Sequence, residues 1–159
     1  MLKQALNSQL KDFADAVNGG TSTDGLYFRI ADLMQTATID CSTITGFTPI
    51  GTSQNPFKGT FDGNGSNLSL AYLTVSVSGT GYNGLFGVVD GGTIKNVSLH
   101  TCTFTGGNMS GAIVGELISG TIEDCSVISC SVTTSGAVNS PLIGGVVGLN
   151  LAGTVSNCT

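Results

Sequence analysis

Charged residues are scarce in this 159-residue sequence. Only 9% of the residues are Asp, Glu, Lys or Arg, and Lys and Arg together number five. The formal net charge of −5 excludes the basic patch that nucleic-acid binding requires, and it does not favour attraction to acidic membranes. We therefore expect no nucleic-acid partner.

Long apolar runs are absent as well. No segment approaches the roughly 18 consecutive apolar residues that identify a bilayer-spanning helix, so we expect no membrane insertion. No charged start followed by an apolar stretch occurs, so we also expect no signal peptide within residues 1–159.

Groups suited to catalysis are few. There is no Trp, and His100 is the single His. Because acid–base and nucleophilic catalysis need titratable groups that converge in a cleft, and the acidic residues here are scattered, we predict no catalytic residue, no cofactor and no enzyme. The alternative is a carbohydrate-active β-helix enzyme, since such enzymes place carboxylates and basic residues on one sheet face. Its candidate residues would be Asp90, Lys95, Glu116, Glu123 and Asp124.

The sequence is rich in glycine, with 24 Gly residues, and it contains a repeated pattern. Each of three copies contains an apolar block ending in Gly and, six residues after that Gly, a segment that begins with Thr. The apolar blocks are 84–87, 112–115 and 145–148, and the Thr segments are 93–97, 121–125 and 154–158. The copies recur at 28 and 33 residues, which is the range of solenoid repeats.

Apolar and polar residues alternate within the copies, which predicts half-buried strands rather than helices. The corresponding apolar positions are Ile94, Val97 and Leu99 in the first copy and Ile122, Cys125 and Val127 in the second. One such turn cannot bury its apolar side alone, whereas stacked turns share a continuous core. We predict an all-β fold, a parallel β-helix (β-solenoid), over residues 21–159. A propeller is the rival fold, but its repeats are longer, about 40 residues.

A weaker copy begins upstream of the three clear ones. Leu68, Ala71 and Leu73 have the same spacing as Ile94, Val97 and Leu99. At the other end, the sequence stops at Thr159 midway through a repeat, so we expect a fragment of a longer protein with further repeats.

Residues 1–20 form the helical passage. An apolar stripe at intervals of three or four residues predicts an amphipathic helix, and Asn18-Gly19-Gly20 supplies its stop. The stripe consists of Leu2, Leu6, Leu10, Phe13 and Val17. We expect this helix to cap the open end of the first coil, because an uncovered end exposes unpaired strand edges. A helix that binds a partner or a membrane surface is the alternative.

Five cysteines occur, so they cannot all pair within one chain. Cys102 and Cys130 hold one repeat position, and Cys125 and Cys158 hold another. Free thiols in a core explain these residues, but stacked positions also bring Cα atoms near disulfide range, so their state stays open.

No metal site is predicted. There is no Cys-x-x-Cys pair, and a single His leaves little for zinc. The segment 62–65, Asp-Gly-Asn-Gly, could be imagined as a calcium loop, but ordinary turn chemistry explains it.

A ladder of hydroxyl side chains is the candidate binding face. In the predicted stack, Thr and Ser side chains of two consecutive coils lie one above the other, while Cys102 and Phe104 point to the other side. The residues are Thr101, Thr103 and Thr105 on one coil, and Ser129, Ser131 and Thr133 on the next. Such a face could order water, as in ice binding, or contact sugars. The simpler explanation is that Thr and Ser suit exposed strand positions.

Two further sets share a repeat position. Lys95 and Glu123 become neighbours on adjacent coils, where a cross-strand ion pair explains them. Asn96, Asp124 and Asn157 form a second set, which we expect to lie at a corner and bond neighbouring backbone.

The repeat resembles the GLUG repeat of bacterial surface proteins. The resemblance is carried by Gly84-Leu85-Phe86-Gly87 and Gly145-Val146-Val147-Gly148, each followed by its Thr segment. The helical stretch 12–20 and the segments 47–51 and 57–65 resemble the regions that precede these repeats. Residues 37–41 depart from the family pattern, which usually has an Asp-Ile-Asp-Leu strand there.

The resemblance implies a secreted or surface-anchored, adhesin-like protein. The repeat also occurs in immunoglobulin-A-cleaving metallopeptidases, outside their catalytic domain. Their zinc signature needs His-Glu-x-x-His, whereas His100 is followed by Thr101, so no catalytic residue carries over. We expect a non-catalytic extracellular or cell-surface stalk or binding unit whose partner is a host glycan or a matrix protein.

Overall fold

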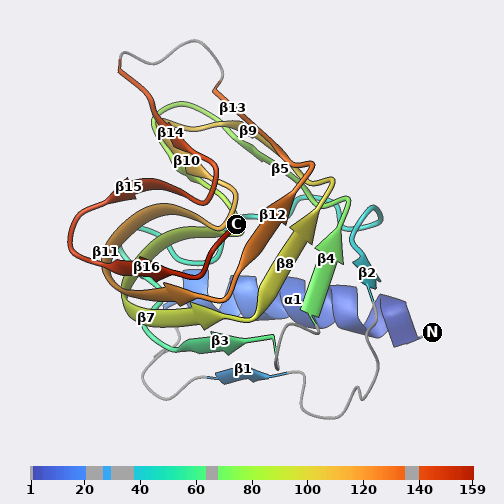
Figure 1. The fold of residues 1–159 in the computed structure, drawn as a ribbon. Helices are drawn as coiled ribbons and strands as arrows, with labels where there is room; N and C mark the ends of the chain where they lie inside the picture. The colour runs from blue at the N-terminus through green and yellow to red at the C-terminus, as the bar shows by residue number, and fades with distance from the viewer. Residues whose placement is uncertain (1, 21–26, 30–37, 64–67, 135–139) are drawn as a thin grey trace.

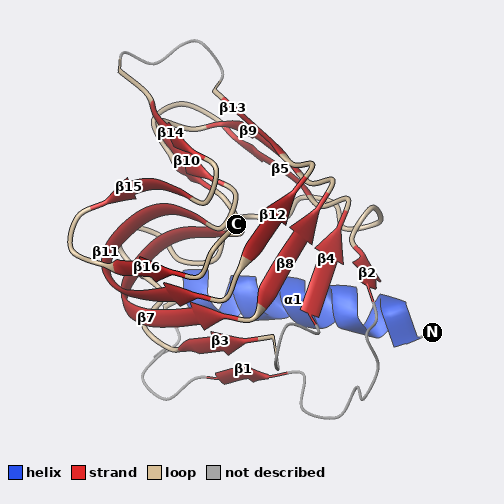
Figure 2. Cartoon of the chain, in the orientation of Figure 1, coloured by secondary structure: helices blue, strands red, loops and turns tan. Residues whose placement is uncertain are grey.

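The computed structural model describes residues 2–20, 27–29, 38–63, 68–134 and 140–159. In this part of the chain a single helix, α1 (Leu2–Asn18), accompanies a stack of short strands (Figures 1 and 2). Each described strand pair is parallel. Because neighbours in each sheet come from successive turns of the chain, the fold is a parallel β-solenoid of about four turns, which confirms the prediction.

The strands form four sheets, here named A to D. Sheet A contains β1 (Tyr27–Arg29), β3 (Thr60–Asp62), β7 (Phe86–Lys95), β11 (Val114–Glu123), β15 (Val147–Asn150) and β16 (Thr154–Ser156). Sheet B contains β2 (Thr38–Asp40), β4 (Leu68–Ala71), β8 (Val97–His100) and β12 (Ser126–Ile128). Sheet C contains β5 (Thr74–Val77), β9 (Thr103–Gly106) and β13 (Ser131–Thr133). Sheet D contains β6 (Tyr82–Asn83), β10 (Met109–Gly111) and β14 (Leu142–Gly144).

Each complete turn crosses sheets B, C, D and A in that order. We name the turns the first coil (residues 38–62), the second coil (68–95), the third coil (97–123) and the fourth coil (126–156). Equivalent residues pair across coils: Ile94 faces Ile122, and Ile122 faces Val155. Because equivalent positions stack in continuous sheets rather than lying on separate blades, the propeller alternative is wrong.

The predicted register of the second coil is also wrong. The spacing matched Leu68, Ala71 and Leu73 to Ile94, Val97 and Leu99, but the structure pairs Leu68 with Val97 and Leu70 with Leu99. Leu73 follows a corner at Tyr72, whose φ is 62°. Leu68, Ala71 and Leu73 span the corner at Tyr72, whereas Ile94, Val97 and Leu99 span the corner at Asn96. The spacing of apolar residues alone did not distinguish these two corners.

The core lies inside the stack and is dominated by aromatic and branched side chains. Phe57, Phe61, Phe86 and Phe104 are all fully buried. The ring centroid of Phe86 lies 5.0 Å from that of Phe57 and 5.2 Å from that of Phe61, so residues of the first and second coils share one aromatic cluster. Rings at these separations pack favourably beyond the area that they bury.

Helix α1 packs on the N-terminal part of this core (Figure 1). Leu10, Ala14 and Val17 are buried, and the Phe13 ring lies 5.9 Å from both Phe57 and Phe61. Of the predicted stripe, Leu10, Phe13 and Val17 therefore pack against the solenoid core, while the side chains of Leu2 and Leu6 lie outside the described residues. No helix in the described part of the chain is long and apolar enough to cross a membrane.

The fourth coil lies at the end of the stack that the described residues form, and several of its apolar side chains are exposed. Five exposed large apolar residues belong to this end of the stack: Ile128, Leu142, Ile143, Leu151 and Val155. Of their counterparts in the third coil, Ile122 beneath Val155 and Ser110 beneath Ile143 are buried.

Candidate binding face

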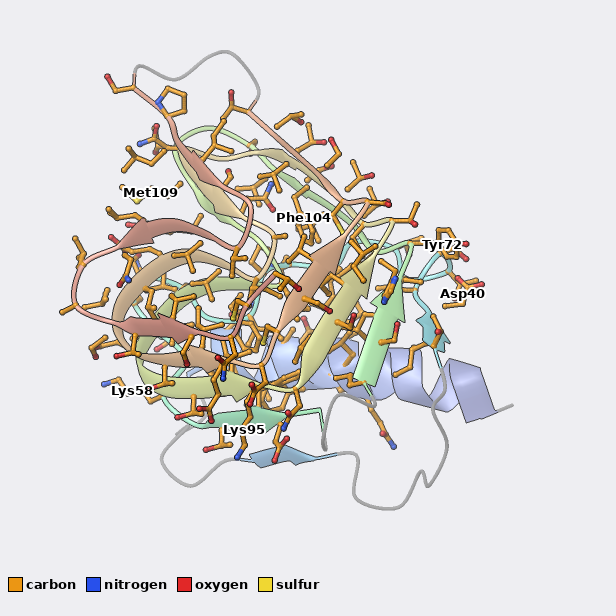
Figure 3. All side chains as sticks on the ribbon, viewed as in Figure 1. Asp40, Lys58, Tyr72, Lys95, Phe104 and Met109 are labelled. Carbon is orange, nitrogen blue, oxygen red and sulfur yellow. The ribbon has the colours of Figure 1, made fainter. Side chains whose placement is uncertain are left out.

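The outer face of sheet C carries an ordered array of exposed hydroxyl groups. Thr103 of β9 faces Ser131 of β13, and Thr105 faces Thr133. All four side chains are exposed, whereas Phe104 between them is fully buried (Figure 3). The alternation of a strand thus holds one row of hydroxyls outward while an aromatic ring anchors it from inside.

The array extends one coil further than the sequence predicted. Thr74 of β5 faces Thr103, and Ser76 faces Thr105. Both are exposed. We define the sheet C hydroxyl face as the two rows Thr74, Thr103 and Ser131, and Ser76, Thr105 and Thr133. Sequence reasoning missed Thr74 and Ser76 because the register of the second coil was set wrongly; with Leu70 matched to Leu99, both positions follow.

Thr101 and Ser129, the other two residues of the predicted face, lie outside the strands. Each has φ of 53° and follows the last residue of a sheet B strand. Tyr72 takes the same place in the second coil, with φ of 62° and an exposed side chain at the outer corner (Figure 3). These three residues form a corner row beside the sheet C hydroxyl face rather than part of it.

The spacing of the face follows from strand geometry. Neighbouring strands lie about 4.8 Å apart, and every second residue along a strand is displaced by about 6.6 Å. The face is therefore a regular lattice of hydroxyls that can each donate and accept a hydrogen bond. The side chains of Val75 and Phe104, which point inward from the same strands, are fully buried and pack in the core behind the hydroxyl face.

A groove adjoins the edge of this face. It has a volume of about 750 Å³ and runs between residues 48–53, next to the end of α1, and residues 76–82, which lead into sheet D. Its lining includes Ser76 of the hydroxyl face, together with Thr48, Pro49, Thr80 and Tyr82. The lining thus combines several hydroxyl-bearing side chains with apolar surface that includes one aromatic ring.

Asn18 at the end of α1 holds the wall of the groove. Its Nδ2 donates to the carbonyl oxygen of Pro49 (3.0 Å), and its Oδ1 accepts from the backbone N–H of Gly51 (2.8 Å). On the other side, the hydroxyl of Tyr82 donates to the carboxylate of Glu116. Burial, and then the nearby negative charge of Glu116, raise the pKa of Tyr82 above its ordinary value.

The carboxylates considered for an enzyme do not converge. Asp90 accepts a hydrogen bond from Ser119 (2.8 Å), and Glu116 accepts one from Tyr82. Lys95 and Glu123 are neighbours in register as predicted, but the ion pair of Lys95 is with Asp62, at 3.7 Å between Nζ and Oδ2.

The corner residues use their side chains differently from the prediction. Asn96, Asp124 and Asn157 share one corner position, with φ of 58°, 53° and 52°. Asn96 donates to Asp62 (2.8 Å) and Asn157 donates to Asp124 (3.2 Å), so their amides bond acidic side chains of the preceding coil rather than backbone. Asn and Asp tolerate the left-handed conformation better than most residues, which explains their presence here.

Acidic residues do not gather into a metal site in the described part of the chain. Among those residues, no group of three or more His, Cys, Asp or Glu side chains could hold a metal ion. Of the calcium-loop alternative, Asp62 is bonded by Asn96, while Asn64 and Gly65 lie outside the described residues.

A second hydroxyl ladder, not predicted, lies on sheet A. Thr60, Thr93, Thr121 and Thr154 pair in register across four coils. Thr60, Thr93 and Thr121 are half-buried, in contrast to the fully exposed rows of sheet C. The Thr that begins each repeated segment, at positions 93, 121 and 154, could have predicted this ladder from the sequence.

Comparisons with known proteins agree with the repeat. Residues 139–159 match the family described as the GLUG motif. In the structure residues 140–156 belong to the fourth coil. Val147 of that coil stacks through Val114 on Phe86, so the motif positions 84–87, 112–115 and 145–148 are equivalent.

A relative supports the same assignment over most of the chain. The sequence is 34% identical over 146 residues to Halomucin of Haloquadratum walsbyi (strain DSM 16790 / HBSQ001). The match covers 87% of this chain but only 2% of that protein. No solved structure matches significantly. The motif match, the related protein and the stacked repeat together identify the chain as a GLUG-repeat protein.

Proposed function

We propose that this chain is a non-catalytic, adhesin-like module of the extracellular or cell-surface space that binds a glycan through the sheet C hydroxyl face. The observation that carries the proposal is the exposed two-row array Thr74, Thr103, Ser131 and Ser76, Thr105, Thr133. A glycan chain presents hydroxyls at repeated intervals, and a rigid hydroxyl lattice offers it many donor–acceptor pairs at once.

The groove beside the face supports a glycan over an extended apolar ligand. Its wall contributes further hydroxyls and the Tyr82 ring, and a sugar ring combines hydroxyls with an apolar face that packs on aromatic rings. The low charge of the chain disfavours a strongly charged ligand. A matrix protein is the alternative partner. A binding array that carries both glycans and matrix proteins distinguishes the two partners.

The first test is binding to an array of glycans and matrix proteins by the intact chain and by the double variant Thr103→Val, Thr105→Val. Valine keeps the branched shape and removes the hydroxyl. Since each lost hydrogen bond costs about 1 kcal/mol, we expect glycan affinity to fall about tenfold or more. The same glycans should remain uncleaved after incubation.

The matched control is Thr93→Val, Thr121→Val, which makes the same chemical change on sheet A. This control should bind as the parent chain does. Glycan binding that survives the sheet C variant, or that falls equally with the sheet A variant, would contradict the assignment of the face, and cleavage of the glycan would contradict the non-catalytic role.

The regularity of the array favours one second candidate, binding to an ice surface. Two parallel rows across three coils give a flat lattice with spacings of about 4.8 and 6.6 Å, which can order water. We expect the chain to inhibit ice recrystallisation and Thr103→Ala to weaken this effect. A lack of inhibition, or inhibition unchanged by Thr103→Ala, would remove this candidate.

A further inference from the structure

Four of the five cysteines lie in two vertical pairs between the third and fourth coils. Cys102 and Cys130 each precede the first residue of a sheet C strand, and those residues, Thr103 and Ser131, are paired in register. The backbone N–H of Ser131 also donates to the carbonyl of Cys102 (2.9 Å). Cys130 therefore lies directly above Cys102 in the stack.

The second pair is Cys125 and Cys158. Glu123 and Ser156 are paired in register, and each cysteine follows two residues later. The backbone N–H of Thr159 donates to the carbonyl of Cys125 (3.1 Å), which fixes the coils against each other at this point. The repeat thus brings a cysteine over a cysteine twice.

The side chains of each pair point the same way. The thiol of Cys125 donates to the carbonyl of Glu123 (3.3 Å), and that of Cys158 donates to the carbonyl of Ser156 (3.2 Å), so each uses the carbonyl two residues before it. In the other pair, the Cys130 sulfur accepts from the backbone N–H of Cys102 at 3.3 Å. The Cys130 sulfur thus lies close to Cys102, and Cys158 lies near enough to Cys125 to contribute to the raised pKa of that thiol.

Strand spacing puts these pairs within reach of a covalent bond. Residues in register on adjacent strands are about 4.8 Å apart, and disulfides join Cα atoms separated by about 4.4–6.8 Å. Disulfides need Cβ atoms slightly closer than parallel strands hold them, so one coil must shift by some tenths of an ångström. Cys130 and Cys158 are only half-buried, so their side of each pair can make this shift.

We propose that Cys102 bonds to Cys130 and Cys125 bonds to Cys158, so that two disulfides fasten the fourth coil to the third under oxidising conditions. An extracellular location would supply such conditions, but the pairing itself follows from the stacking alone. The disulfide proposal can therefore be tested independently of glycan binding.

Accessibility determines which thiol reacts first. Cys102 and Cys125 are buried, whereas Cys130 and Cys158 on the end coil are half-buried. Burial raises the pKa of Cys102 and of Cys125 to about 12, which suppresses their thiolates at neutral pH. The attacking thiolates accordingly come from Cys130 and Cys158.

The oxidant that we name is a small-molecule disulfide, of which oxidised glutathione is the test reagent. The Cys130 thiolate attacks one of its sulfurs, forms a mixed disulfide and expels one glutathione thiolate. Cys102 then gives its proton to water, attacks the Cys130 sulfur and expels the second glutathione. Two protein thiols are oxidised while one small disulfide is reduced to two thiols. Cys158 and Cys125 follow the same sequence.

Cys41 is left as the single thiol. It is 1% exposed, its sulfur donates to the carbonyl of Ile39 (3.6 Å), and burial raises its pKa to about 12. Although Cys102 lies near enough to raise the pKa of the Cys41 thiol further, Cys41 is buried within the first coil. It therefore has neither the access nor the room to compete with Cys130.

The experiment counts thiols in the intact chain before and after oxidation. Reduced protein is incubated with reduced and oxidised glutathione, denatured, alkylated and weighed by mass spectrometry. We expect five alkylated cysteines before oxidation and one, Cys41, afterwards, with digestion fragments joined Cys102–Cys130 and Cys125–Cys158. Five alkylated cysteines after oxidation, or a Cys41–Cys102 link, would overturn the proposal.

Matched variants test each bond separately. Cys130→Ser should retain only the Cys125–Cys158 bond, and Cys158→Ser only the Cys102–Cys130 bond. Oxidation should raise the Tm of the parent chain by several degrees and that of each variant by less. Loss of both bonds in either variant would show that the pairs are not independent and would count against the assignment. If a variant fails to fold, the thiol count on the parent chain still decides.

Discussion

Phe86→Ala is expected to lower the free energy of unfolding by about 3–5 kcal/mol, because it opens a cavity where two coils share one aromatic cluster. The Phe86 side chain is fully buried, and its ring centroid lies 5.0 Å from Phe57 and 5.2 Å from Phe61. Phe57 and Phe61 in turn contact Phe13 of α1. The loss should therefore reach the packing of the helix as well as that of the strands.

Urea unfolding monitored by circular dichroism measures this change. Leu151→Ala is the matched control: it truncates another large apolar side chain, but one that is 60% exposed on the fourth coil. It should cost well under 1 kcal/mol, since little area leaves the core. Equal losses in the two variants would mean that Phe86 does not lie in the common core.

The fold could be predicted because the repeat constrains it at several levels. Alternating apolar residues such as Ile94 and Ile122 predicted strands, and their recurrence predicted stacking. The helix stop at Asn18 was equally local, since Gly19 and Gly20 follow it directly. Alternation, recurrence and a helix stop can all be read from neighbouring residues in the sequence, without knowledge of contacts between distant residues.

The second coil shows where spacing fails. Leu68, Ala71 and Leu73 fit the pattern of Ile94, Val97 and Leu99 only when the turn at Tyr72 is ignored, and a corner reverses which side chains face inward. Because that error propagated along the coil, Thr74 and Ser76 were missed from the hydroxyl face. The remaining predicted strand positions, Thr103, Thr105, Ser131 and Thr133, belong to the two coils whose register was right.

The groove beside the face could not be predicted from the sequence. Asn18 bonds Pro49 and Gly51 across more than thirty residues, and no periodic pattern links a helix end to a loop. Tyr82 and Glu116 meet there because sheets D and A adjoin in space, which only the three-dimensional path of the chain reveals.

Gly106→Ala is expected to destabilise the chain by about 3 kcal/mol or more, through strain rather than a cavity. Gly106 ends β9 with φ of 91°, a conformation that side-chain-bearing residues rarely adopt. A Cβ there would come within 1.9 Å of the carbonyl oxygen of Val77 on the coil below. Backbone cannot swing aside as a side chain does, so the two coils would have to separate.

The corner at Gly106 also serves two buried side chains, which raises the cost of moving it. Its carbonyl accepts from Asn83 Nδ2 (3.3 Å) and from Ser110 Oγ (2.8 Å). Gly79→Ala is the matched control, because Gly79 has φ of 67° and no heavy atom within 4 Å of a Cβ. It should cost only the conformational penalty of about 1 kcal/mol. Thermal unfolding measures both changes. Equal decreases in Tm for Gly106→Ala and Gly79→Ala would contradict the close approach of the coils at Gly106.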